Sequence, residues 1–89
     1  MLRTTPLHMG KLNGTIFDFP EIDDILGMHA HTEEDVHITI VAKGSFRVHG
    51  NGWEKEVVSG NVLDWAPHDP HEFIALEPNS RIVNIIKGI

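Results

Sequence analysis

The sequence contains no cysteine and no tyrosine. Without cysteine the chain can form no disulfide and no thiolate metal site, so any metal ion must be held by nitrogen and oxygen ligands. Without tyrosine there is no phenol to serve as a general acid. No apolar run is long enough to cross a membrane, and residues 1–14 lack the apolar centre of a signal peptide. We therefore expect a cytoplasmic protein with no membrane partner.

Basic residues are scarce as well. Seven Lys and Arg stand against thirteen Asp and Glu, which gives a formal net charge of −6. A chain with this charge and no basic cluster along its sequence repels a phosphate backbone. We therefore expect no nucleic-acid partner.

The length of 89 residues fits a single domain covering residues 1–89. A chain of this size buries only about 60 to 65% of the surface that its unfolded form exposes. Its core is therefore marginal, and a bound metal ion or a partner subunit would stabilise it.

Short segments of alternating side chains predict an all-β fold. The clearest segment runs from Asp35 to Ala42 and is rich in β-branched residues. Gly44 and the turn at Gly50-Asn51-Gly52 separate it from the segments that follow. The predicted strands are 15–19, 28–32, 35–42, 45–49, 53–58, 62–65, 71–76 and 81–87. This spacing favours a jelly roll, with residues 1–13 unassigned.

Histidines form the one unusual cluster, since the chain has seven of them. His29 and His31 are two residues apart, so on a strand both imidazoles lie on the same face. A tight turn would bring His37, on the next strand, beside this pair. His71 begins a later strand after a turn containing proline.

Other residues compete for a place in this cluster. Asp35 lies two residues before His37, so on a strand both side chains would share one face. It can serve as a metal ligand or as an acceptor that orients an imidazole. Glu33 and Glu34 are alternative ligands from the turn. The remaining histidines are interpreted as surface, strand-end or turn residues; they are His8, His49 and His68.

Two segments resemble the conserved motifs of the cupin superfamily. The first, about residues 27–44, has His29-x-His31, then five residues to His37, then six to Gly44. The second, about residues 60–73, runs from Gly60 through Trp65-Ala66-Pro67 to His71. The resemblance implies a single-domain jelly-roll cupin barrel, also called a double-stranded β-helix. The metal ligands that it implies are His29, His31, His37 and His71.

The chain departs from the cupin pattern at His37, where the family usually has glutamate. Its site would therefore be an all-histidine one. Neutral imidazoles suit one divalent ion per chain, and Fe, Mn, Ni, Zn and Cu all fit this donor set. The second motif also lacks the usual glycine in the turn at 67–70.

The resemblance implies a metal-dependent function. We expect a small enzyme, similar to cupin oxygenases, that acts on a small chelating molecule at the ion. One alternative is a metal-dependent module that binds or senses a small molecule without turnover, and another is a Lewis-acid isomerase or lyase. The expected substrate pocket is formed by Thr39, Trp65 and Phe73, for which core packing is the competing interpretation.

The faces opposite the histidines are more apolar than a solvated surface should be. We therefore expect a homodimer, with burial under the N-terminal segment as the alternative. The residues expected to form the dimer face are Ile38, Ile40, Ile74 and Leu76.

Overall fold

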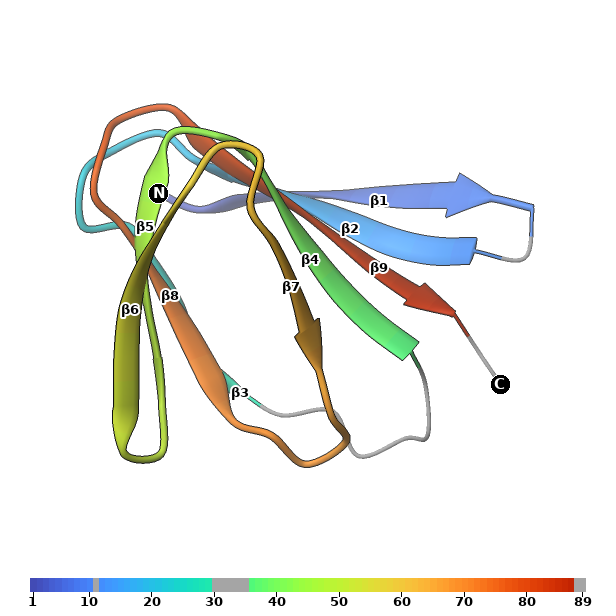
Figure 1. Ribbon diagram of the computed structural model, residues 1–89. Helices are drawn as coiled ribbons and strands as arrows, with labels where there is room; N and C mark the ends of the chain where they lie inside the picture. The colour runs from blue at the N-terminus through green and yellow to red at the C-terminus, as the bar shows by residue number, and fades with distance from the viewer. Residues whose placement is uncertain (11, 30–35, 88–89) are drawn as a thin grey trace.

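The computed structural model describes residues 1–10, 12–29 and 36–87 (Figure 1). These residues form strands joined by turns, and none of them lies in a helix that could span a membrane. The strands are β1 (Arg3–Met9), β2 (Leu12–Phe19), β3 (Ile25–His29), β4 (Val36–Lys43), β5 (Ser45–Gly50), β6 (Trp53–Val58), β7 (Val62–Trp65), β8 (His71–Ala75) and β9 (Ser80–Lys87). The predicted all-β class is confirmed.

The strands build two antiparallel sheets. The five-stranded sheet has the order β1-β2-β9-β4-β7, and the four-stranded sheet has the order β3-β8-β5-β6. Strands that are distant in sequence are therefore neighbours in space, as with β9 between β2 and β4 (Figure 1). This arrangement is a double-stranded β-helix, as predicted.

Side chains from both sheets fill the space between them. The buried apolar residues are Phe19, Val41, Phe46, Val48, Val57, Leu63, Trp65, Phe73, Ala75 and Ile82. Phe46 of the four-stranded sheet meets Phe19 of the five-stranded sheet edge to face, with 4.8 Å between ring centroids. Alternation in β4 and β8 points every second residue into this core, because strand side chains alternate between faces.

Gly44 forms the corner at which the chain passes from one sheet to the other. Its φ of 79° lies in the left-handed region that favours glycine. The buried side chain of Ser80 occupies the place where a Cβ atom on Gly44 would stand. Glycine is thus required both by the backbone conformation and by the neighbour.

The N-terminal segment adds a strand that the sequence does not predict. Residues 3–9 form β1, which pairs with β2 at the edge of the five-stranded sheet. Pro6 interrupts the sequence pattern of a strand, but an edge strand tolerates a residue without an N–H. The predicted strand 15–19 also begins earlier, at Leu12.

The prediction that four apolar residues share one face is wrong. Ile38 and Ile40 lie on β4 of the five-stranded sheet, and Ile74 lies on β8 of the four-stranded sheet. Leu76 follows the end of β8. Because the outer faces of two packed sheets point in opposite directions, these residues belong to two separate surfaces.

Candidate metal centre

Three of the four predicted ligands meet between the two sheets. His71 begins β8 and pairs in register with His29, the last residue of β3. The ring centroids of these two histidines are 4.4 Å apart. His37, on β4 of the other sheet, has its ring centroid 5.7 Å from that of His71. His37 and His71 are both buried, so both sheets contribute an imidazole to one interior place.

The fourth predicted ligand, His31, lies outside the described residues, and so does Asp35. The same holds for Glu33 and Glu34. Within the part of the chain that the structure describes, no group of three or more His, Cys, Asp or Glu is placed to hold a metal ion. The structure therefore places three predicted residues together, and metal binding itself remains a prediction.

A β-bulge in β3 turns His29 toward the interior. Gly27 and Met28 together lie opposite the single residue Glu72. In a regular strand Met28 would share the inner face with Leu26, which packs against the core. The extra residue reverses the alternation, so His29 takes the inner position and Met28 is exposed.

Backbone carbonyls fix two of the imidazole rings. The Nδ1–H of His29 donates to the Gly27 carbonyl oxygen, and the Nδ1–H of His71 donates to the Asp69 carbonyl oxygen, each over 2.8 Å. A carbonyl oxygen can only accept, so Nδ1 carries the hydrogen in both rings. In the neutral ring the lone pair is then on Nε2. Metal-binding histidines are commonly oriented in this way.

Trp65 supports the ring of His71 from one side. The two rings are stacked, with 3.9 Å between centroids and 11° between planes. Trp65 Nε1–H donates to Thr39 Oγ1 over 2.9 Å, and the Thr39 hydroxyl donates to Asn84 Oδ1 over 2.6 Å. Phe73 meets His71 edge to face. The predicted pocket residues Thr39, Trp65 and Phe73 thus lie beside the histidines as part of the packed interior.

Two polar residues of this region were not predicted from the sequence. Asn84 is buried on the inner face of β9. The sequence feature that could have indicated it is a polar residue between the inward positions of Ile82 and Ile86. Glu72 lies on the outer face beside His71. The sequence indicates Glu72 less clearly than Asn84, because an outward glutamate on a strand is usually solvated.

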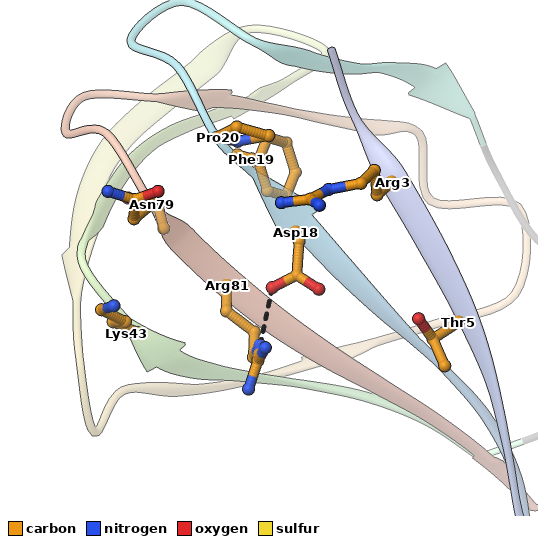
Figure 2. A pocket seen from close by; sticks show the side chains of 9 residues that line it. Arg3, Thr5, Asp18, Phe19, Pro20, Lys43, Asn79 and Arg81 are labelled. Atoms are coloured by element: carbon orange, nitrogen blue, oxygen red, sulfur yellow. Dashed lines mark hydrogen bonds and ion pairs between the residues drawn. The ribbon is translucent and has the colours of Figure 1, made fainter.

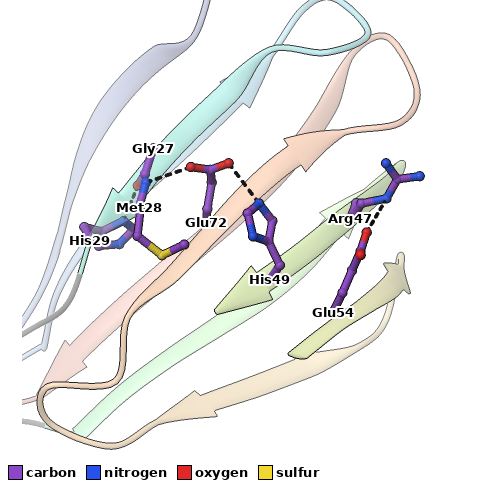
Figure 3. A network of polar contacts seen from close by, with 7 residues as sticks. All are labelled: Gly27, Met28, His29, Arg47, His49, Glu54 and Glu72. Atoms are coloured by element: carbon purple, nitrogen blue, oxygen red, sulfur yellow. Dashed lines mark hydrogen bonds and ion pairs between the residues drawn. The ribbon is translucent and has the colours of Figure 1, made fainter. Parts of the chain in front are cut away.

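Glu72 connects the bulge to the neighbouring strand (Figure 3). Its Oε2 accepts the Met28 N–H over 3.1 Å, and its Oε1 accepts from Nε2 of His49 over 2.9 Å. One carboxylate therefore accepts the backbone N–H of Met28 in the bulge, and the His49 side chain on β5 holds that carboxylate in place. The pair of Arg47 and Glu54, on the same sheet, is a separate and more exposed contact.

We predict that Glu72→Ala weakens metal binding by about 10- to 100-fold, the usual effect of removing a group that orients a metal-binding histidine. The physical reason is that Met28 loses its acceptor, so the bulge no longer holds His29 in place. Competition with a chromogenic chelator measures the change in the dissociation constant. Glu54→Ala is the matched control, and equal affinities in the two variants would contradict the role given to Glu72.

His8 and His68 lie apart from this cluster. His8 is exposed on β1 and contacts Asn13 over 3.0 Å. His68 is exposed in the turn before β8 and has a φ of 64°. These placements agree with their interpretation as surface and turn residues.

Structural comparison identifies the fold. KdgF from a Halomonas species superposes with a TM-score of 0.84 at 22% identity, over 99% of this chain and 79% of that chain. An RmlC-like cupin protein from Desulfovibrio desulfuricans superposes with a TM-score of 0.85 at 20% identity, over 97% and 81%. A cupin 2 conserved barrel domain protein from Salinispora arenicola gives 0.80 at 15% identity, over 97% and 75%.

No family model and no curated protein matches the sequence. The chain therefore shares the double-stranded β-helix fold of these cupin structures.

Proposed function

We propose that this protein is a metal-dependent cupin that holds one divalent ion with His29, His31, His37 and His71. The observation that carries the proposal is that the rings of His29 and His37 both lie close to the ring of His71. Two of these rings are anchored through Nδ1. The donor set fits an ion such as Fe, Mn, Ni, Zn or Cu, because all of these accept imidazole nitrogen. His31 would complete the set from residues 30–35.

The proposed activity is an oxygenase-like reaction on a small chelating molecule. A bound ion of this kind supplies Lewis-acid or redox chemistry. The protein contributes the orientation of the imidazoles through Gly27 and Asp69, and a dry interior around His71 formed by Trp65 and Phe73. The chain has no tyrosine, and none of the described inward-facing residues of the strands is a carboxylate. Chemistry centred on the ion is therefore the simplest assignment.

The first experiment is elemental analysis of untagged protein purified without chelator. We expect about one equivalent of a transition metal per chain, and a strongly reduced content in His71→Ala. Absence of metal after reconstitution with each of the five ions would overturn the proposal.

Assays of the loaded protein then separate the alternatives. Oxygen uptake with a chelating substrate supports an oxygenase, and full activity with zinc supports an isomerase or lyase, since zinc has no redox chemistry. Metal-dependent binding without product supports a binding or sensing module. The proposed place of action is the cytoplasm.

We also propose a homodimer formed by the outer face of the five-stranded sheet. Ile38 and Ile40 on β4 pair in register with Ile85 and Val83 on β9, and Val83 pairs with Ile16 on β2. Ile40, Val83 and Ile16 form one apolar row across three strands, and Ile38 and Ile85 form a second row across two. A second copy packed on them would add buried surface to a domain whose own core is small.

Ile40→Lys is expected to convert the dimer to a monomer, because a lysine in the centre of the apolar face would be desolvated without a partner charge. Sedimentation velocity at micromolar concentration measures the change. Ile74→Lys, on the outer face of the other sheet, is the control and should leave the dimer intact. A monomeric parent protein would contradict the proposed dimer.

A further inference from the structure

A cavity lies at the other end of the sandwich from the clustered histidines. It is a half-open cavity of about 390 Å³ on the five-stranded sheet, where β2 ends and β9 begins (Figure 2). His37 and Lys43 stand near opposite ends of β4, and Lys43 lines this cavity. At the ordinary rise of a strand the two residues are roughly 20 Å apart. The cavity is therefore separate from the candidate metal centre.

Strand register explains the charges of this cavity. Arg3 pairs with Asp18, Asp18 pairs with Arg81, and Arg81 pairs with Lys43. Four charged side chains thus form one row across β1, β2, β9 and β4. Neighbouring strands are about 4.8 Å apart, so the row is compact enough for several side chains to reach one small ligand.

The row contains more cations than its single carboxylate can neutralise. Arg81 Nε donates to Asp18 Oδ1 over 2.7 Å, which neutralises one cation. Arg3 and Lys43 remain, so three cations and one carboxylate leave an excess of two positive charges. The chain carries only seven Lys and Arg and a net charge of −6. Gathering three of the seven around one cavity is the opposite of what the overall composition favours.

The cavity also provides hydrogen-bond donors. The contact with Asp18 uses Nε of Arg81 and leaves its two terminal nitrogens as donors, and a guanidinium matches the oxygens of phosphate or carboxylate. Asn79 and Thr5 add an amide and a hydroxyl on opposite sides of the cavity (Figure 2). Its volume lies within the range of small-molecule sites, about 300 to 1,000 Å³.

We propose that this cavity binds a small dianion, such as a phosphate monoester or a dicarboxylate. The oxygens of the ligand lie between Arg3, Arg81 and Lys43, and its two negative charges match the local excess of positive charge. The site does not depend on the metal, so the protein carries two separate small-molecule sites.

The test is a titration with inorganic phosphate and with malonate, followed by two-dimensional amide NMR. We expect saturable shifts confined to the ends of β1, β2, β4 and β9 next to the cavity, and weaker binding at high salt because the charges are screened. The dissociation constant should be the same with and without metal. Whichever probe binds more tightly identifies the class of dianion.

Arg3→Gln and Lys43→Gln should each weaken binding at least tenfold. Arg47→Gln and Lys55→Gln, which remove exposed cations from the other sheet, are the controls. Circular dichroism verifies that all four variants are folded. Equal losses in variants and controls, or shifts that do not saturate, would overturn the proposal. Sedimentation that shows loss of the dimer in Arg3→Gln, without anion binding by the parent protein, would assign the cavity to a second copy instead.

Discussion

Replacing His71 with alanine is expected to lower metal affinity by more than about 100-fold, since removal of a mere orienting partner already costs 10- to 100-fold. His71 is fully buried, and its ring centroid lies 4.4 Å from that of His29 and 5.7 Å from that of His37. Its loss removes one of the proposed ligands and also empties the space against Trp65. Elemental analysis together with chelator competition measures the effect.

His68→Asn is the matched control for this variant. His68 belongs to the turn that leads into β8, and its positive φ is one that asparagine adopts readily. This control should retain full metal content. A His71→Ala protein that is folded and still binds one equivalent tightly would remove His71 from the ligand set.

Phe46→Ala is expected to lower the free energy of unfolding by about 3 to 5 kcal/mol, the usual range for truncating a buried phenylalanine. Phe46 is fully buried and contacts Phe19 of the opposite sheet, so the variant leaves a cavity between the two layers. Because small domains have only about 5 to 15 kcal/mol in total, much of the stability would be lost. Urea unfolding followed by tryptophan fluorescence measures the change.

Val58→Ala tests whether the loss comes from burial. Val58 lies on β6 next to the partner of Phe46 in register, but 54% of its surface is exposed. Its truncation should change stability by no more than about 0.5 kcal/mol. A similar small change in Phe46→Ala would mean that the two sheets do not depend on this contact.

Alternation in the sequence predicts most strands of this fold because it reports which side chains lie inside. The predicted segments 45–49, 53–58 and 62–65 agree with β5, β6 and β7 to within one residue. The same alternation predicts that Thr39, Trp65 and Phe73 point inward, and the structure confirms this. The resemblance to the cupin motifs adds the fold, which alternation alone does not specify.

Features that depend on a partner strand could not be predicted. Alternation tells which face of a strand is inside, but not to which sheet the strand belongs, so Ile40 and Ile74 were assigned to one face. The bulge at Gly27 is a register shift against β8, and the spacing of His29 and His31 in the sequence does not indicate it. The charged row of Arg3, Asp18 and Arg81 likewise exists only once β1, β2 and β9 are paired.

The position of β9 has a consequence for how the chain folds. This strand comes last in the sequence but lies in the middle of the five-stranded sheet, between β2 and β4. Residues some seventy positions apart, such as Asn13 and Ile86, must therefore find each other before the sheet is complete. Such long-range pairing slows folding to the millisecond-to-second range typical of all-β domains. Until β9 is in place, the edges of β2 and β4 remain open to pairing with other chains.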